Sequence, residues 1–128
     1  MYLLDSDVLI DLLRSYDPAV RWVNSISDEE LLVPGLAAME LIQGCRNKPE
    51  KRRVERALSK FGIIWPTSET CDHALALFSE CYLRDGIGII DALVAQMAVD
   101  LGVPLMTFNS KHYACVAALN ALQPYSRP

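Results

Sequence analysis

The chain has 128 residues, a formal net charge of −4 and a hydrophobic content of 52%. This length suits one domain that buries about 65–70% of its unfolded surface without disulfides or structural metals. The acidic balance argues against general affinity for nucleic acid, because phosphate contacts depend on Lys and Arg. No apolar run approaches the ~18 residues of a membrane span, and an apolar run already begins at Tyr2. We therefore expect no membrane segment, no signal peptide and a cytoplasmic location.

Short apolar runs alternate with amphipathic stretches along the whole chain. Strands are predicted at residues 2–4, 31–33, 63–65 and 105–107, with a short fifth strand near 121–123. Helices are predicted at residues 8–14, 17 to about 27, 36–43, 49–60, 68–85 and 89–101. Such alternation is typical of a parallel sheet of four or five strands with helices on both faces.

Local signals set the ends of these helices. Asp17, followed by a proline, and Ser68 are the predicted N-caps of the second and fifth helices. Gly86 and Gly102 are the predicted stops of the last two helices. In the last helix, the apolar spacing predicts a buried stripe that ends at Leu101.

Three carboxylates and one amide occupy comparable positions in this pattern. Asp5 follows the first strand, Glu40 lies in the helix after the second, Asp91 opens the helix before the fourth, and Asn109 follows the fourth. Since the carboxyl ends of parallel strands share one edge of a sheet, these groups can gather there. Each carboxylate also has an ordinary structural explanation: an N-cap for Asp5, a solvated surface residue for Glu40, and a favourable helix dipole for Asp91.

Gathered carboxylates repel one another unless a cation neutralises them. The cluster therefore indicates a metal site, and oxygen ligands favour Mg²⁺ or Mn²⁺ over zinc. The four cysteines form no C-x-x-C pair, and no histidine stands at zinc spacing, so the sequence predicts neither a zinc site nor a redox motif. Ions of the magnesium type bind phosphates and activate water for in-line attack.

A basic stretch breaks the acidic balance of the chain. Seven of the 12 Lys and Arg residues lie between positions 46 and 60. Four of them recur at helical spacing on one side of the predicted helix: Lys48, Arg52, Arg56 and Lys60. This face is a candidate path for a nucleic-acid backbone, although a charge run is more often simply a solvated face.

Four motifs, taken together and in order, resemble those of PIN domains. They are LLDSDVLID with Asp5, MEL with Glu40, GIGIIDALVA with Asp91 and MTFNSKHY with Asn109. The likeness spans essentially the whole chain, residues 1–128, as a single PIN-like domain. More narrowly, it resembles the VapC-type ribonuclease toxins of prokaryotic toxin–antitoxin modules.

The resemblance implies a three-layer sandwich with a central parallel sheet and a Mg²⁺- or Mn²⁺-dependent endoribonuclease of a type II toxin–antitoxin system. Asp5, Asp91 and Glu40 would hold the metal: the two aspartates as core ligands, and Glu40 as a third ligand or as the group that orients the attacking water. Ser6 and Thr107 would be supporting hydroxyl groups. It further implies an RNA substrate such as transfer RNA, a cognate antitoxin and a homodimer. Many relatives place a further acid in the last motif, where this chain has Asn109 and His112. An amide oxygen can still accept a water or a metal.

Two other interpretations remain open at this point. Asp5 and Asp7 after an apolar strand also fit a haloacid-dehalogenase-like, Mg²⁺-dependent phosphatase, with the first as nucleophile and the second as general acid. The chain is short for that fold and offers no convincing late acidic pair. The other alternative is a PIN-like interaction module without catalysis, which would gain no thermal stability from Mn²⁺.

Overall fold

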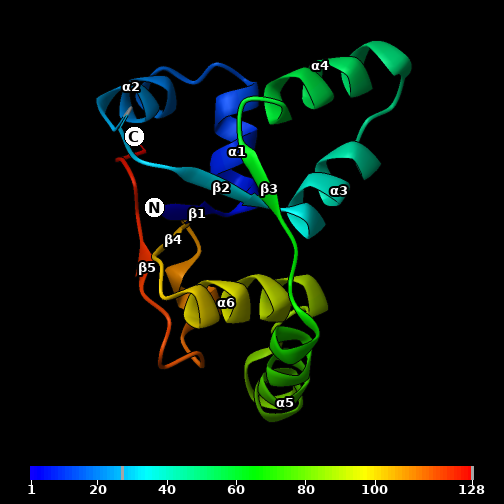
Figure 1. Ribbon diagram of the computed structural model, residues 1–128, viewed down its shortest axis with the longest axis vertical. Helices are drawn as coiled ribbons and strands as arrows, with labels where there is room; N and C mark the ends of the chain where they lie inside the picture. Colours follow the sequence, from blue (N-terminus) through cyan, green and yellow to red (C-terminus); the bar gives the residue numbers. More distant parts are fainter. Residues whose placement is uncertain (27, 128) are drawn as a thin grey trace.

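The computed structural model describes residues 1–26 and 28–127. Its core is a five-stranded parallel sheet in the order β3-β2-β1-β4-β5 (Figure 1). The strands are β1 (Tyr2–Leu4), β2 (Leu31–Pro34), β3 (Gly62–Ile64), β4 (Leu105–Met106) and β5 (Ala121–Leu122). The predicted parallel sheet is confirmed, including its short fifth strand.

Six α-helices and one 3-10 helix lie in the described ranges. They are α1 (Ser6–Leu13), α2 (Asp17–Ser25), α3 (Gly35–Gln43), α4 (Lys48–Leu58), α5 (Ser68–Asp85), α6 (Ile89–Leu101) and η1 (Ser110–Tyr113). Ser27, the predicted end of the second helix, lies outside the described residues. No helix in these ranges combines the length and apolarity needed to cross a membrane.

The sheet buries both of its faces, as expected for parallel strands linked by helices. Successive side chains of β1 point to opposite faces: Leu3 packs in a core with α6, whereas Leu4 packs in a second core with α1, α3 and α4. In Figure 1, α1 to α4 accordingly lie on one side of the sheet, with α5 and α6 on the other. This arrangement confirms the predicted three layers.

Two predicted helix caps are displaced by one residue. Tyr16 occupies the N-cap position of α2, and Asp17 is the first helical residue, where its carboxylate pairs with Arg21 at 2.9 Å. In α5 the cap is Thr67 rather than Ser68, since Thr67 Oγ1 accepts the backbone N–H of Thr70 at 3.1 Å. Adjacent hydroxyl residues look equivalent in a sequence, but only the one with extended backbone can cap.

The C-terminal ends of the last two long helices follow the predicted pattern, whereas one buried position does not. Gly86 and Gly102 adopt left-handed φ values of 67° and 68° and end α5 and α6. Leu101 is 50% exposed, so the prediction that it belongs to the buried stripe is wrong. It is the last residue of α6 and borders an open hollow beside β3 instead of the core.

A tight contact fixes the start of α3, the helix that carries Glu40. Pro34 ends β2 and Gly35 begins α3 with no intervening loop. A Cβ on Gly35 would lie 2.4 Å from the indole of Trp65, so only glycine allows the indole to pack this closely. The packing therefore holds the first turn of α3 against the segment that follows β3.

Candidate active site

Asp5 is the centre of a buried polar cluster at the carboxyl edge of the sheet. It follows β1 directly and is 6% exposed. Its Oδ1 accepts the backbone N–H of Ser6 at 2.9 Å, which makes Asp5 the N-cap of α1. Its Oδ2 faces the other way and accepts two hydroxyl groups from distant parts of the chain. Asp5 therefore both caps α1 and belongs to the polar cluster.

The two hydroxyl donors come from the end of β4 and from η1. Thr107, which is fully buried, donates to Asp5 Oδ2 at 2.8 Å. The Tyr113 hydroxyl donates to the same oxygen at 2.9 Å and approaches Asp91 Oδ1 at 3.4 Å. Burial and the charges of Asp5 and Asp91 raise the pKa of Tyr113 far above its ordinary value. Tyr113 therefore remains protonated and links the two acids as a donor.

Asp91 lies in the first turn of α6, next to the residues of η1. Its Oδ2 lies 2.7 Å from His112 Nε2. Gly88, the N-cap of α6, leaves room for this carboxylate, since a Cβ there would be 3.2 Å from Asp91 Oδ2. His112 and Tyr113 are neighbours on η1, so this short helix contacts both oxygens of Asp91.

Glu40, on α3, lies close enough to Asp5 and Asp91 to feel their negative charges. Its side chain is exposed, yet partial desolvation and the negative charges of Asp91 and Asp5 raise its pKa. Three carboxylates from β1, α3 and α6 therefore share one negative field. In the described part of the chain, no choice of one oxygen from each brings all three within 4.8 Å of one another.

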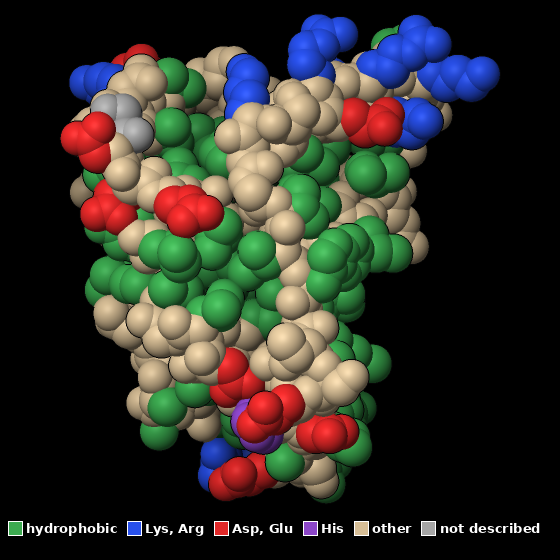
Figure 2. All heavy atoms as spheres, in the orientation of Figure 1, with side chains coloured by type: hydrophobic (Ala, Val, Ile, Leu, Met, Phe, Trp, Pro, Cys, Tyr) green, Lys and Arg blue, Asp and Glu red, His purple; other side chains and the backbone are tan. Residues whose placement is uncertain are grey.

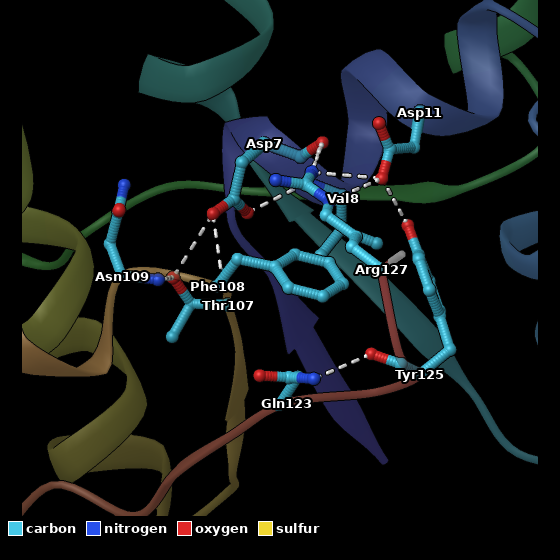
Figure 3. Close-up of polar contacts among 9 residues, drawn as sticks. All are labelled: Asp7, Val8, Asp11, Thr107, Phe108, Asn109, Gln123, Tyr125 and Arg127. Atoms are coloured by element: carbon cyan, nitrogen blue, oxygen red, sulfur yellow. Dashed lines mark hydrogen bonds and ion pairs between the residues drawn. The ribbon is translucent and has the colours of Figure 1, made fainter.

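The other predicted site residues lie at the same edge but make fewer contacts. Asn109 is exposed, and its backbone N–H donates to Thr107 Oγ1 at 3.0 Å while its amide points away from that hydroxyl (Figure 3). Ser6 contributes its backbone N–H to Asp5. Neither the Asn109 amide nor the Ser6 hydroxyl makes a hydrogen bond to any residue that the structure describes.

Asp7 supports the edge of the site in a way that the sequence analysis did not assign. Its Oδ2 accepts the backbone N–H of Phe108 at 2.9 Å, and its Oδ1 accepts that of Val8 at 2.7 Å (Figure 3). Burial, and to a smaller extent Asp5, raises the pKa of Asp7. Asp7 thus ties the start of α1 to the segment after β4.

A second polar cluster holds the C-terminal segment against α1. Asp11 accepts the Tyr125 hydroxyl at 2.7 Å and pairs with Arg127 at 2.8 Å (Figure 3). The Arg127 guanidinium also lies 3.8 Å from the centre of the Phe108 ring. Because Phe108 is bonded to Asp7, this cluster connects the C-terminal segment to the border of the acidic site.

The predicted basic face lies on α4, at one end of the molecule (Figure 2). Lys48, Arg52, Arg56 and Lys60 are all exposed, and none pairs with a carboxylate in the described residues. By contrast, Lys51 on the same helix pairs with Glu55 at 3.7 Å. Lys60 lies just beyond the end of α4. The predicted face is thus free to contact an anion.

The fold, the acidic edge and the chain's relatives agree on its class. A model of the PIN domain family matches residues 2–117, and the chain belongs to this family. It is 34% identical over 116 residues to ribonuclease VapC10 of Mycobacterium tuberculosis, a match that covers 88% of this chain and 86% of that protein. Family membership sets aside the phosphatase alternative.

Solved structures share the fold over almost the full length. A toxin–antitoxin complex from Klebsiella pneumoniae superposes with a TM-score of 0.77 at 23% identity, covering 99% of this chain and 100% of that one. A DNA-bound VapBC from Salmonella typhimurium superposes with a TM-score of 0.81 at 18% identity, covering 96% and 97%. The predicted PIN-like fold is confirmed.

Proposed function

We propose that this protein is a Mg²⁺- or Mn²⁺-dependent endoribonuclease that acts as the toxin of a type II toxin–antitoxin system in the cytoplasm. The observation that carries the proposal is the shared negative field of Asp5, Glu40 and Asp91 at the carboxyl edge of the sheet. The identity to a ribonuclease of the same family supports the reaction class. Phosphodiester hydrolysis at such a site needs a cation to offset the charge of the acids and of the phosphate.

The donor set suits a hard divalent cation. Carboxylate oxygens are the ligands that Mg²⁺ and Mn²⁺ prefer. Asp5 Oδ1 accepts one hydrogen bond, and Asp91 Oδ1 accepts only the long one from Tyr113, so both oxygens keep lone pairs for a cation. Glu40 would be the third ligand. When bound, the cation would polarise the scissile phosphate and lower the pKa of an attacking water.

The protein's own groups would prepare this chemistry. Thr107 and Tyr113 fix the Asp5 carboxylate in one orientation before substrate arrives. His112 holds the Oδ2 atom of Asp91, so the Oδ1 atom of Asp91 remains available on the side of Tyr113 and Asp5. Glu40, exposed and with a raised pKa, is suited to orient the attacking water. Asn109 lies at the rim, where its free amide would contact water or substrate.

RNA would approach along the basic face of α4. The exposed charges of Lys48, Arg52, Arg56 and Lys60 suit a phosphate backbone, and the rest of the chain is acidic. The substrate would therefore be guided to one side of an otherwise repulsive protein. Transfer RNA is the first defined substrate to test.

A cognate antitoxin is the proposed partner that holds the toxin inactive. The toxin–antitoxin complexes with this fold support the partner class. This chain also has an apolar hollow of about 380 Å³ among α1, α2 and α4, of the kind that a partner's apolar side chains would fill. Its lining includes Leu12, Val23 and Phe61. A charged residue at Leu12 is expected to weaken complex formation in co-purification, and circular dichroism verifies the variant's fold because Leu12 also packs against the core.

We also propose that the protein forms a homodimer. Large apolar side chains on α5 and at the start of α6 are exposed: Leu75 by 69%, Leu83 by 92% and Ile89 by 66%. Leu75 and Ile89 line one apolar hollow between α5 and α6, and exposed apolar side chains gathered in this way are typical of an interface. Light scattering is expected to give the mass of two chains, and Leu83→Lys the mass of one.

Cleavage of a mixed cellular RNA pool tests the function. Wild type should produce discrete fragments with Mg²⁺ or Mn²⁺ and none with EDTA. Asp5→Ala and Asp91→Ala should produce none, whereas Asp72→Ala, which removes an exposed acid on α5, should cleave normally. Folded wild type that neither cleaves RNA nor gains thermal stability from Mn²⁺ would instead identify a non-catalytic interaction module.

A further inference from the structure

The structure brings together three potential metal ligands that the sequence spacing had not indicated. Cys81 and Asp85 lie one turn apart near the end of α5, and Cys115 follows η1. One ligand atom from each lies within 4.8 Å of the other two, and this is the one such group in the part of the chain that the structure describes. The two cysteines are 34 residues apart, so no C-x-x-C pattern reveals them.

The chemistry of these donors differs from that of the acidic site. Two thiols and one carboxylate suit a borderline cation such as Zn²⁺, whereas Mg²⁺ prefers oxygen ligands alone. We propose that Cys81, Asp85 and Cys115 form a second metal site, which binds Zn²⁺ through three protein ligands and leaves a fourth position for water. This proposal does not depend on the proposed ribonuclease function.

The surroundings permit binding from the solvent side. Cys81 is 1% exposed, Cys115 is half-buried and Asp85 is exposed, so the cluster opens outward through its carboxylate. Asp85 Oδ2 pairs with Arg84 Nε at 2.8 Å, which leaves Oδ1 available as a ligand. Cys81 Sγ lies 3.8 Å from the carbonyl oxygen of Cys115 and donates only this weak hydrogen bond.

Without a cation, the cluster disfavours thiolates. Burial, the neighbouring Cys81 thiol and the Asp85 charge raise the pKa of Cys115 to about 11. Zn²⁺ binding would reverse this effect, since a bound divalent cation stabilises thiolates and releases their protons. Binding is therefore expected to strengthen as pH rises, and to release protons that calorimetry in two buffers can count.

The position of the site gives binding a structural consequence. Cys115 lies two residues after Tyr113, whose hydroxyl contacts Asp5 and Asp91. A cation shared by Cys81, Asp85 and Cys115 would join the segment after η1 to the end of α5. Binding is therefore expected to raise the melting temperature, which is a readout independent of catalysis.

Titration of freshly reduced full-length protein with Co²⁺, in excess Mg²⁺, tests the proposal. Wild type should bind one Co²⁺ with the near-ultraviolet charge-transfer absorption of cobalt thiolate, and Zn²⁺ should displace it. Cys115→Ser should lose this absorption, and Asp85→Asn should weaken the binding. Cys45→Ser and Cys71→Ser, which change cysteines outside the cluster, should keep it, and so should Asp5→Asn.

Three outcomes would overturn the proposal. The first is the absence of charge-transfer absorption in folded wild type. The second is its persistence in Cys115→Ser, a variant chosen because Cys115 is less buried than Cys81 and circular dichroism can verify its fold. The third is loss of two hydrogen masses in air without any Co²⁺ binding by the reduced protein. That result, with the disulfide mapped to Cys81 and Cys115 by peptide mass analysis, would identify this pair as a disulfide former instead.

Discussion

The acidic site and the basic face of α4 differ in how far their charged groups are buried and held by partners. At the acidic site, Asp5 is buried and accepts hydrogen bonds from Ser6, Thr107 and Tyr113, so its carboxylate is held by a fixed set of donors. The four side chains of the basic face are exposed and lack ion-pair partners in the described residues: Lys48, Arg52, Arg56 and Lys60. Buried charges act strongly at short range, whereas exposed charges are screened by salt and act together. The fixed carboxylates therefore suit a catalytic site, and the exposed basic side chains suit attraction of RNA to the protein surface.

The largest effect is expected from neutralising one acid of the buried site. Asp5→Asn and Asp91→Asn should each reduce RNA cleavage by at least about 100-fold, because the loss of a cation ligand removes several kcal/mol of transition-state stabilisation. Gel analysis of fragments under single-turnover conditions measures this effect. Asp72→Asn is the matched control, and full activity in Asp91→Asn would contradict the proposed site.

A smaller but measurable effect is expected from removing one donor to Asp5. Thr107→Val leaves a buried carboxylate oxygen with one hydroxyl partner fewer and removes the acceptor of the Asn109 N–H. The free energy of unfolding should fall by about 1–3 kcal/mol. Urea denaturation measures it, and Thr107→Ser, which keeps the hydroxyl, should restore most of the loss. Equal stability of the Val and Ser variants would show that the hydrogen bond contributes nothing.

The basic face should respond to salt rather than to precise geometry. Arg52→Gln together with Arg56→Gln should weaken RNA binding and lower the slope of log affinity against log salt by about 1.4, on the basis of ~0.7 per lost contact with a single strand. Stability should change by less than about 0.5 kcal/mol. Lys51→Gln is the control on the same helix, because Lys51 already pairs with Glu55. An unchanged slope would exclude α4 from the RNA path.

The smallest effect concerns the pH dependence of stability. Burial raises the pKa of Asp7 in the folded state, so folding favours its protonated form. Its contribution to stability is therefore fully present below the ordinary carboxyl pKa and declines as pH rises through the folded-state value. Asp7→Asn should lack this decline, which denaturation curves collected from acid to neutral pH can measure. An identical pH profile in the variant would show that Asp7 titrates normally.

Most of the fold was predictable from the sequence because apolar periodicity and helix-ending residues are local signals. Apolar runs identified all five strands, and Gly86 and Gly102 end helices where expected. The caps at Asp17 and Ser68 were each misplaced by one residue. Thr67 and Ser68 have the same capping chemistry and differ in backbone conformation, whereas Tyr16 occupies the N-cap position of α2 without a side-chain hydrogen bond. Leu101 has the right period but lies at the end of its helix, beyond the core.

Glu40 lies inside α3, whereas the other two predicted acids each follow a strand or open a helix, which makes them easier to predict. These two acids are Asp5 and Asp91, and a hydroxyl group of Tyr113 connects them in the structure. Tyr113 and His112 were not assigned contacts with the acids, because a short 3-10 helix has no period that fixes its orientation. Cys81 and Cys115 were missed for a similar reason, since only the contact between the end of α5 and the segment after η1 brings them together.

The long sequence separation of the Asp5 contacts has a consequence for synthesis. Its hydroxyl partners lie 102 and 108 residues further along the chain. A nascent chain that has emerged from the ribosome only as far as α5 therefore carries Asp5 and Glu40 but neither Thr107 nor Tyr113. Contacts between such distant residues can form only after the later residues have been synthesised. An enzyme that attacks RNA would thus remain harmless to the translation machinery while that machinery is still making it.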